Sequence, residues 1–554
     1  MESKLREIIH HLLKEYASVT VTVLPDPLEF DLNISKDNTH GDFATNVAFK
    51  LARHARAKPQ EIAANLVRLF EGAERNSRER FIDRMEVAGG GFINFYLKKA
   101  SLAEILLEIH RADKDYGKSD YGRNCPVLLE FVSANPTGPL TIAHGRQAAI
   151  GDSLARILNA TGHKAAKEFY LNDAGRQMGL LGQSLWVRYQ EQFKRKVEIP
   201  EDGYHGDYLK TLSHTLVQMK GEALLKGELA EAVSFCQGYA KTEILEQIKD
   251  DLKTFGVQFD SFFHESALYE KDAVKKTLAF LKDKNQLYEQ GGALWFRSTS
   301  YGDDKDRVVQ KSTGEFTYLA PDIAYHHDKF ERGFRRLVNF WGPDHHGYVV
   351  RLKAACEALG HRQEEITIRI VQLTTLFRKG EPVKMSTRAG EFVTLKELMD
   401  EVGVDAARFF FIMRRVESPL DFDLDLAKQK SQENPVYYLQ YAHARAVSIL
   451  KFANRQVTNQ VDLTRIESQE ALDLVKALGE FPKCLIQAAE MLEPYRVTEY
   501  LRELAMAFHK FYQHHRVVTE DEALTQALLL LVDSVRIVIR NGLEVLGISQ
   551  PESM

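Results

Sequence analysis

Apolar residues recur with helical spacing at the N-terminus of the chain and gather in strand-like runs further on. The first fifteen residues place apolar side chains three or four positions apart, which predicts an amphipathic helix. A short strand is predicted at "FINFYL" (92–97), directly after the glycines 89–91. Those glycines match neither Gly-x-Gly-x-x-Gly nor a P-loop, so a tight turn is the better interpretation.

A strand, a rigid turn and a helix follow one another between residues 126 and 162. "PVLLEFV" (126–132) is apolar and bounded by turn residues, which favours a buried strand. "GRQAAIGDSLARILNATG" (145–162) has helical spacing and ends at Gly162. This order is typical of the start of a parallel α/β sheet. Further strand-like runs are "ALWFRS" (293–298), "RLVNFWG" (336–342) and "ITIRIVQL" (366–373).

Two regions have a helical period instead. Residues from about 185 to 290 are charge-rich and mostly helical in pattern, and they interrupt the α/β order, which predicts an insertion. From "GVDAARFFFIM" (403–413) to the C-terminus the period is helical throughout. The polar stretch 110–124 is interpreted as a linker.

The patterns together predict an α/β protein with a Rossmann-like parallel-sheet domain, an N-terminal α+β domain and a C-terminal all-α bundle. The expected boundaries are 1–105, 106–380 with the insertion at about 185–290, a connecting helical region at 381–434, and the bundle at 435–554. A chain of 554 residues is long enough for three or four such domains.

Composition and charge exclude several classes of protein. The net charge of −5 rules out a protein coated in positive charge, although a local basic stripe is enough to bind nucleic acid. The four cysteines form no Cys-x-x-Cys pair, so we expect buried thiols rather than a disulfide framework or a zinc knuckle. The N-terminus lacks the pattern of a signal peptide, and the most apolar run, 527–540, contains Asp533 and Arg536. We therefore expect a cytoplasmic protein with no membrane contact.

The turn "ANPTGPLTIAHGR" (134–146) is the first candidate for chemistry. It follows a predicted strand, and ligands of parallel sheets bind beyond the carboxyl ends of the strands. A helix N-terminus offers free N–H groups to a phosphate, and His144 can donate to an anionic oxygen. A helix cap with an internally satisfied histidine explains the same residues equally well.

A second candidate is the stretch "RKGEPVKMSTRAGEFVTL" (378–395). Lys379, Lys384 and Arg388 stand on it with two glycines, and cationic side chains on such a loop can close on phosphates as charge builds in a transition state. The alternative is a solvated basic loop without a ligand.

These two stretches resemble the paired signatures of class I aminoacyl-tRNA synthetases, His-x-Gly-His at 141–144 and Lys-Met-Ser-Lys at 384–387. The chain as a whole is similar to the arginyl-tRNA synthetases, because several longer motifs follow in that family's order. They are "HGDFATNVAFKLAR" (40–53), "EFVSANPTGPLTIAHGR" (130–146), "YLNDAGRQ" (170–177), "TYLAPDIAYHHDKFERGF" (317–334), "WGPDHHGYVVRLKAA" (341–355), "VGVDAARFFFIMR" (402–414), "SPLDFDLDLA" (418–427) and "NPVYYLQYAHAR" (434–445).

The resemblance implies an activity and its partners. An enzyme of this family joins L-arginine to ATP, used with Mg²⁺, to form arginyl-adenylate and pyrophosphate, and then transfers the arginyl group to the 3′ end of arginine tRNA. No tightly bound metal or organic cofactor is implied, and a monomer is expected. The N-terminal segment would contact tRNA and the C-terminal bundle would bind the anticodon.

The resemblance also implies roles for individual positions. His144 and Lys384 would be the catalytic residues, as donors to the ATP phosphates. The expected ATP-binding residues are Thr141, Ala143, His144, Gly342, Asp344, His345, Lys384, Met385 and Ser386. The expected arginine-binding residues are Glu130, Asn135, Tyr318 and Asp322. The expected tRNA-binding residues are Tyr438, Tyr441 and Arg445.

Some positions depart from the family pattern or have a second interpretation. Thr141 stands in place of the first signature histidine and Thr387 in place of the last signature lysine, for which Lys379 and Arg388 are the candidate substitutes. Glu130 and Asp322 also suit ordinary salt bridges, and Asp344 with His345 and His346 a metal site, although adjacent ligands are poorly spaced for one ion. A tyrosine stripe such as 438–441 is also typical of a helix core.

Two other functions compete with this one. One is a synthetase of the same class with another amino acid as its substrate. The other is a tRNA-binding protein without catalysis, against which the presence of both His144 and Lys384 argues.

Overall fold

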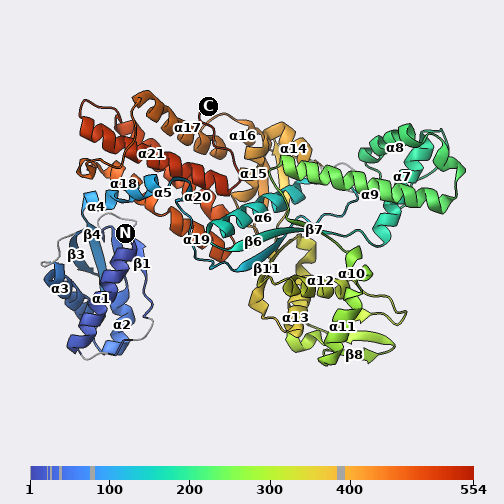
Figure 1. The fold of residues 1–554 in the computed structure, drawn as a ribbon, viewed down its shortest axis with the longest axis horizontal. Coiled ribbons are helices and arrows are strands. Elements are labelled where there is room, and N and C mark those ends of the chain that lie inside the picture. The colour runs from blue at the N-terminus through green and yellow to red at the C-terminus, as the bar shows by residue number, and fades with distance from the viewer. Residues whose placement is uncertain (1, 21–22, 25–27, 36–39, 75–80, 384–392) are drawn as a thin grey trace. The chain divides into compact units, whose positions relative to one another are not determined.

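A computed structural model describes residues 2–20, 23–24, 28–35, 40–74, 81–383 and 393–554 (Figure 1). Packing divides the chain into two units. Unit 1 holds residues 1–116, 446–480 and 506–538, and unit 2 holds residues 117–445, 481–505 and 539–554. The predicted C-terminal bundle, 435–554, is helical as expected, but it does not pack as one body, because 481–505 and 539–554 pack with the sheet domain.

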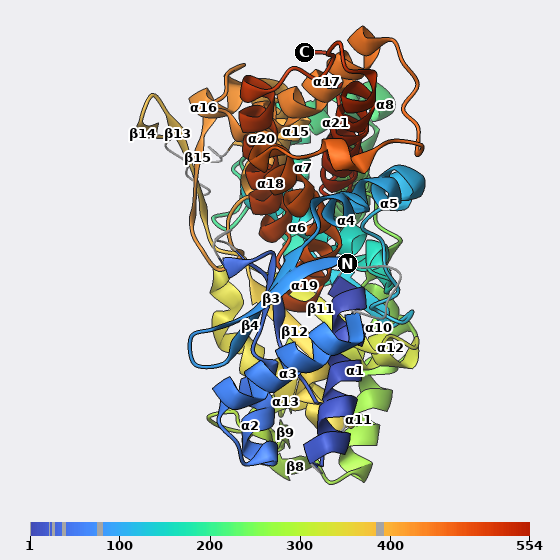
Figure 2. The ribbon, with the colours of Figure 1, turned by 90° about the vertical axis from the view of Figure 1, so that its left-hand side faces the viewer.

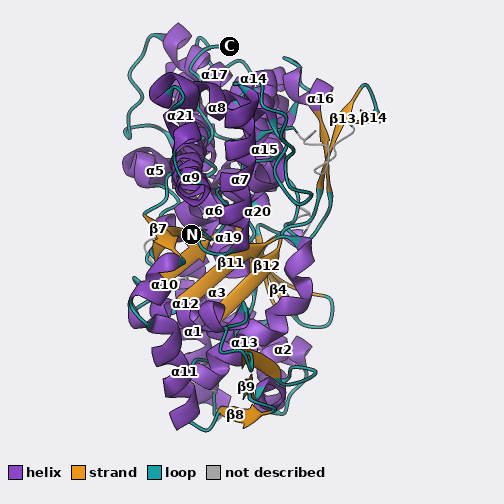
Figure 3. Ribbon diagram, turned by 90° about the vertical axis from the view of Figure 1, so that its right-hand side faces the viewer, coloured by secondary structure: helices purple, strands orange, loops and turns teal. Residues whose placement is uncertain are grey.

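A five-stranded parallel sheet forms the core of unit 2 (Figure 3). Its strands, in spatial order, are β12 (Ile366–Ile370), β11 (Arg336–Trp341), β5 (Pro126–Glu130), β6 (Lys164–Leu171) and β7 (Ser261–His264). The chain begins at β5, adds β6 and β7 on one side and then adds β11 and β12 on the other. Such a reversal is the place where doubly wound sheets bind ligands, and the predicted Rossmann-like fold is confirmed.

Helices connect these strands. They are α6 (Ile142–Ala160) after β5; α7 (Arg176–Glu191), α8 (Asp207–Lys220), η3 (Ala223–Lys226) and α9 (Leu229–Thr254) after β6; α10 (Ser266–Glu270), α11 (Ala273–Asp283) and α12 (Leu319–Glu331) after β7; and η5 (Pro343–Tyr348), α13 (Val349–Leu359) and η6 (Gln363–Glu365) after β11. Helix α7 packs on both α8 and α9, and this helical segment runs from 176 to 254, whereas the insertion was predicted at about 185–290 (Figure 1).

Two sequence-based expectations need correction. The predicted insertion, 185–290, contains β7, a strand of the main sheet, because "SFFH" (261–264) is too short to show a clear period. The region from 403 onward is not helical throughout, because β15 (Leu420–Asp423) pairs in parallel with β13 (Thr374–Arg378). In β15 only alternate residues are buried, which is a strand pattern.

Smaller elements complete unit 2. An antiparallel sheet contains β8 (Leu287–Gln290), β9 (Ala293–Phe296) and β10 (Arg307–Gln310), with η4 (Ser298–Tyr301) between the last two. Another sheet contains β14 (Glu381–Pro382), β13 and β15. The further helices are α14 (Leu395–Val402), α15 (Val404–Ile412), α16 (Leu424–Lys428) and α19 (Phe481–Met491), with parts of α17 (Pro435–Ala453), α20 (Tyr495–His514) and α21 (Glu522–Val545).

Unit 1 contains the predicted α+β domain (Figure 2). Its antiparallel sheet has the order β1 (Leu32–Ile34), β2 (Phe43–Thr45), β4 (Phe92–Leu97) and β3 (Ile82–Ala88). The helices α2 (Val47–Ala55) and α3 (Pro59–Glu74) pack against β4, and α1 (Glu2–Thr20) packs against α3. The glycines 89–91 form the predicted tight turn between β3 and β4.

The stretch 110–124, expected to be a linker, is partly helical. It overlaps α5 (Ile105–Ala112) and η2 (Asp113–Asp115), which follow α4 (Lys99–Ala103). The unit also contains η7 (Leu463–Arg465) and α18 (Gln469–Gly479), which contacts α4 and α5. In the part of the chain that the structure describes, no helix combines the length and the apolar character needed to cross a bilayer.

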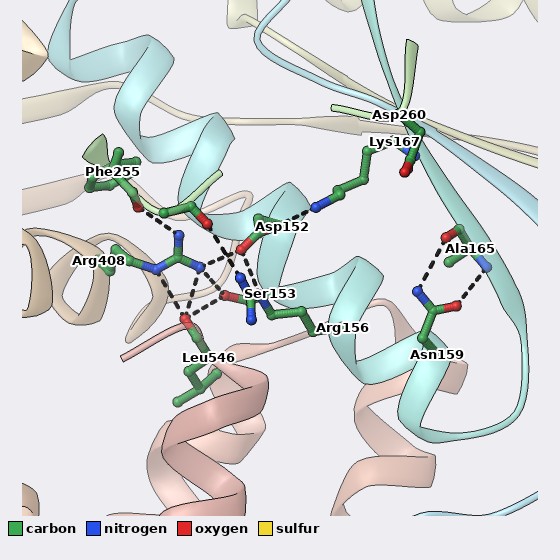
Figure 4. Close-up of polar contacts among 11 residues, drawn as sticks. Asp152, Ser153, Arg156, Asn159, Ala165, Lys167, Phe255, Asp260, Arg408 and Leu546 are labelled. Carbon is green, nitrogen blue, oxygen red and sulfur yellow. Dashed lines mark hydrogen bonds and ion pairs between the residues drawn. The ribbon is translucent and has the colours of Figure 1, made fainter. Parts of the chain in front are cut away.

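A buried arginine fixes α6 within unit 2 (Figure 4). The Arg408 guanidinium, which is inaccessible to solvent, pairs with Asp152 of α6 at 2.7 Å. It also donates to the Phe255 carbonyl (3.0 Å) and to the Leu546 carbonyl (2.9 and 3.1 Å). Asp152 is also paired with Arg156 and Lys167. One charged group thus holds α6, the residue that follows α9 and the end of α21 together.

We expect Gly547→Ala to destabilise unit 2 strongly. Gly547 has a φ of +67°, and an added Cβ would lie 2.3 Å from an Arg408 nitrogen. Displacing the guanidinium from Asp152 should cost about 3 kcal/mol or more. Gly333→Ala is the matched control, because its φ is +91° but nothing lies within 4 Å of its added Cβ. That change should cost about 1 kcal/mol from backbone conformation alone.

The chain's three tryptophans, Trp186, Trp295 and Trp341, all belong to unit 2, so the thermal midpoint of tryptophan fluorescence reports this unit alone. Equal midpoint shifts in the two variants would contradict a special role of the contact with Arg408.

Candidate active site

The loop that leaves β5 is strained. Val132 and Ser133 have φ values of +67° and +39°, which are unusual for residues with a Cβ and most unusual for a β-branched one. The Val132 amide donates to Gln147 Oε1 of α6 (3.1 Å), and the Ser133 amide donates to the Phe131 carbonyl (2.9 Å). Strain of this kind persists only where the surroundings enforce it, and it concentrates at functional sites. The loop therefore has a fixed shape at the carboxyl edge of the sheet.

His144 lies in the first turn of α6, at the mouth of this loop. Its Nδ1 accepts from the Thr141 backbone N–H (3.1 Å) in a capping-box arrangement. Nδ1 is then the acceptor, so the proton of the neutral ring is on Nε2. Burial lowers the pKa of His144 to about 4, which keeps the ring neutral at pH 7. The cap role is thus real, and it leaves one N–H donor for a ligand.

The second signature, 384–387, lies outside the described residues. It contains Lys384, Met385 and Ser386, and Arg388 also lies outside the described residues. Just after this segment, Leu395 donates its N–H to the Leu140 carbonyl (2.8 Å), and Thr394 forms an antiparallel bridge with Thr141. The chain that follows the second signature therefore returns directly to the first. Lys379, one candidate substitute, lies at the turn between β13 and β14, where its N–H donates to Asp425.

Three carboxylates converge at the carboxyl edge of the sheet, and we call Glu130, Glu265 and Asp322 the acidic cluster. Glu130 ends β5, Glu265 follows β7, and Asp322 lies in the first turn of α12. The pKa of Asp322 is raised to about 7, chiefly by burial and also by the charges of Glu130 and Glu265, whereas a hydrogen bond from Tyr348 (2.7 Å) and the charge of Lys329 oppose the shift. The cluster thus has an excess of negative charge that a cation would relieve.

Each predicted arginine-binding residue has a distinct environment. Glu130 is buried and ion-paired with Lys329 (2.5 Å), so the salt-bridge interpretation holds for this residue. Asn135 donates to Gln177 Oε1 (2.7 Å). Tyr318 caps α12 and is 85% exposed, one turn before Asp322. The structure therefore brings Glu130 and Asp322 together, and the exposed Tyr318 lies one helical turn before Asp322 in the sequence.

Sequence reasoning missed Glu265 and Tyr348. Burial raises the pKa of Glu265, and Tyr269 donates to its carboxylate (3.3 Å). Glu265 was overlooked because the sequence around β7 was assigned to a helical insertion, so its position directly after a strand of the main sheet was not recognised. A short apolar run followed by a carboxylate, "FFHE" (262–265), was the available signal.

The other expected ATP-binding residues lie beyond the carboxyl end of β11 and at the start of α6. Gly342 precedes η5, where Asp344 and His345 are exposed and 3.4 Å apart. Ala143 is exposed in the first turn of α6. Among the residues with described positions, no group of three His, Cys, Asp or Glu side chains is arranged to hold a metal ion.

The expected tRNA-binding residues lie on α17 and are partly buried. Tyr438, Tyr441 and Arg445 are neither core residues nor fully exposed, and Tyr441 stacks on Tyr437 at 6.4 Å. Tyr437 and Gln440, on the same helix, line a cavity of about 720 Å³ in unit 2. Of the residues predicted to bind ATP or arginine, none of those that the structure describes lines that cavity.

The arrangement combines two complementary features along one sheet edge. The N-terminus of α6 and the Nε2–H of His144 offer donors to an anion. The acidic cluster offers acceptors to a cation. A cationic ligand bound at the acidic cluster and a phosphate bound at the start of α6 would fit these two features.

Three family models together match most of the chain. The family model described as "Arginyl tRNA synthetase N terminal domain" matches residues 3–97. The model "tRNA synthetases class I (R), catalytic domain" matches residues 106–414, and the model "DALR anticodon binding domain" matches residues 439–554.

Individual relatives agree. The arginine–tRNA ligase of Desulfosudis oleivorans is 47% identical over 98% of this chain and 97% of that protein. Arginine–tRNA ligase 1 of Halalkalibacterium halodurans is 44% identical over 100% of this chain and 99% of that protein. The arginyl-tRNA synthetase structure from Thermus thermophilus covers both chains completely, with a TM-score of 0.76 and 21% identity, and supports the fold. On the matched models and on this identity over nearly the full length, the chain belongs to the arginyl-tRNA synthetase family of class I aminoacyl-tRNA synthetases.

Proposed function

We propose that the protein is an arginine–tRNA ligase that activates L-arginine with ATP and transfers the arginyl group to arginine tRNA. The observation that carries the proposal is the acidic cluster beside the donor-rich N-terminus of α6, in a chain of this family. The cluster suits a guanidinium, and the helix end suits the phosphates of ATP, which is used as its Mg²⁺ complex.

The first step is an attack of the arginine carboxylate on the α-phosphorus of ATP, which releases pyrophosphate. Catalysis of such a step is mostly positioning and electrostatic stabilisation. His144 donates from Nε2–H to a phosphate oxygen, and Lys384, on the loop tethered at Thr394, stabilises the negative charge on the α-phosphate. Met385 and Ser386 hold that loop. In the second step the terminal ribose hydroxyl of tRNA takes the arginyl group and AMP leaves.

The remaining residues bind the two small substrates. Asp322 and Glu130 accept from the guanidinium, Tyr318 covers it, and Asn135 holds the α-amino or carboxylate group. Thr141, Ala143, Gly342, Asp344 and His345 contact the nucleotide. The exposure of Tyr318 supports these roles, because a bound substrate would cover its ring. The raised pKa of Asp322 supports them as well, because a bound guanidinium would stabilise the ionised carboxylate.

Other parts of the chain bind tRNA. The segment 1–105 contacts tRNA, 106–380 is catalytic, and 381–434 carries the signature loop and connecting helices. The segment 435–554 binds the anticodon, with Tyr438, Tyr441 and Arg445 on its RNA-facing side. The enzyme acts as a monomer in the cytoplasm. All four cysteines are free thiols, which suits a reducing compartment.

Charging of total tRNA with labelled arginine tests the function directly. Label should enter tRNA only when ATP is present. A parallel ATP–pyrophosphate exchange assay with each amino acid, in the presence of tRNA, separates this function from that of a synthetase for another amino acid. Faster exchange with any other amino acid, or charging that does not depend on ATP, would refute the proposal.

Arginine binding should weaken as the pH falls below 7. The pKa of Asp322 is raised to about 7, so the carboxyl becomes neutral below that pH, and a guanidinium pairs only with the ionised form. The KM for arginine should rise about tenfold per pH unit below 7. Asp322→Asn should raise this KM about 100-fold, or about 3 kcal/mol, above pH 7, and should flatten the profile, so that the two enzymes converge as the pH falls.

The KM for ATP, measured in the same experiments, controls for changes in nucleotide ionisation. A profile of equal slope in Asp322→Asn would show that another group titrates.

Two substitutions separate the capping and donor roles of His144. His144→Glu keeps a capping box with Thr141 but places a negative charge beside the phosphates, so it should fold normally and slow adenylate formation about 10³-fold. His144→Ala loses both roles, so it should lose about 1 kcal/mol of stability and slow the same step about 10²–10³-fold. Single-turnover adenylate formation and thermal melting give the two readouts. Near-normal activity of His144→Glu would mean that the histidine only caps the helix.

A further inference from the structure

A row of buried polar residues crosses the parallel sheet and includes Glu130 of the acidic cluster. Asn339 of β11, Glu130 of β5 and Glu168 of β6 are paired in register across three neighbouring strands. Their exposed fractions are 0%, 6% and 0%. Strands covered on both faces are normally apolar, and buried polar groups are costly unless fully hydrogen-bonded. The row therefore calls for a physical explanation.

One face of α12 satisfies this row. Lys329 Nζ donates to Glu130 Oε2 (2.5 Å) and to Asn339 Oδ1 (3.3 Å). Tyr325 donates to Glu168 (2.7 Å), and Arg332 pairs with both oxygens of Glu168 (2.7 and 2.8 Å). These contacts lock the rotation of α12 on the sheet, and α12 carries Asp322 in its first turn.

The remaining contacts form a chain with a defined direction. His326 Nδ1 lies 2.8 Å from the Asp322 carbonyl, which can only accept, so Nδ1 carries the ring proton. His326 Nε2 then accepts from Asn339 Nδ2 (2.8 Å). The Oδ1 atom of the same asparagine accepts from Lys329. Each contact along this path therefore joins one donor to one acceptor, and Lys329 donates to both Asn339 and Glu130. The chain connects the counter-ion of Glu130 to the backbone of Asp322.

We propose that Lys329, Asn339 and His326 form a positioning network that fixes Asp322 relative to Glu130 and thereby favours arginine over lysine. The inference rests on the proposed function, because it assigns a role behind the same site. A guanidinium needs acceptors in one plane at a set spacing, whereas an ammonium is a compact point charge on a flexible stem. Loosening the two carboxylates should therefore harm arginine binding more than lysine binding.

The network acts through other residues rather than on the substrate. Lys329 and Asn339 are 0% exposed, and His326 is 2% exposed. The Lys329 ammonium lies 4.1 Å from the centre of the Tyr325 ring, which closes off its free side. Its charge also compensates Glu130, so that the three carboxylates of the acidic cluster can coexist.

Substitution of His326 tests the proposal in the full-length enzyme. His326→Phe removes both hydrogen bonds of the ring and should raise the KM for arginine about tenfold or more in pyrophosphate exchange with tRNA present. The KM for ATP should change less than twofold, and the arginine-to-lysine ratio of kcat/KM should fall about tenfold. His326→Gln keeps an acceptor for Asn339 and should recover most of the loss.

His327→Phe is the matched control. His327 lies on the same helix and stacks on Phe280, but its Nδ1 has no hydrogen-bond partner in the described structure. This variant should keep the wild-type constants. If His326→Phe does not fold, Asn339→Val takes its place, because valine suits a buried strand and removes the same path.

Three results, in whichever of His326→Phe and Asn339→Val folds, would overturn the network. The first is an unchanged KM for arginine. The second is a rise in the KM for ATP equal to the rise in the KM for arginine, and the third is an unchanged arginine-to-lysine ratio of kcat/KM. Failure of the proposed function would look different, since the wild-type enzyme itself would then show no arginine-dependent exchange.

Discussion

The buried pair of Arg408 and Asp152 is the constraint on which the catalytic unit depends. A guanidinium sealed from water must find a partner for every N–H, and here the partners come from α6, from the residue after α9 and from the residue after α21. Removing one member of such a pair leaves an uncompensated charge worth about 3–5 kcal/mol. The orientation of α6, and with it the position of His144, is therefore tied to segments almost four hundred residues apart in the sequence.

The substrate site also contains buried charged groups, but there the charges are not all compensated within the protein. At Arg408 every charge is compensated, whereas in the described part of the chain the Asp322 carboxylate accepts a hydrogen bond from the Tyr348 hydroxyl and has a pKa near 7. Glu130 has its own counter-ion in Lys329. The site thus contains one carboxylate, Glu130, that an ion pair within the protein neutralises, and another, Asp322, whose raised pKa a cationic ligand would lower. A cationic substrate completes the pairing that folding leaves unfinished.

Long patterns were readable from the sequence, and short ones were not. The strand at 126–130, the helix that carries His144 and the parallel sheet followed from runs of apolar residues and from turn chemistry. The strands β7 and β15 have four residues each, too few to show a period, so Glu265 was lost along with β7. Lys329 and Asn339 could not be found either, because their importance lies in the register of β11 with β5, which only the folded sheet reveals. The turn and helix pattern indicated His144, and the family resemblance indicated Asp322, but the residues packed around the acidic cluster come from distant segments.

The departures from the first signature have a physical basis in the fold. Thr141 is the N-cap of α6 and bridges Thr394, and threonine is a favourable N-cap, so this position contributes to the helix and to the loop tether as well as to any ligand. Ala143 is exposed, so its methyl group displaces no protein atom. The glycine that the packing requires is Gly145, where an added Cβ would lie 2.7 Å from Leu395 and 3.1 Å from Phe411. Close approach of α14 to α6 therefore depends on a glycine just beyond the signature, and this approach brings the end of the second signature loop to the first.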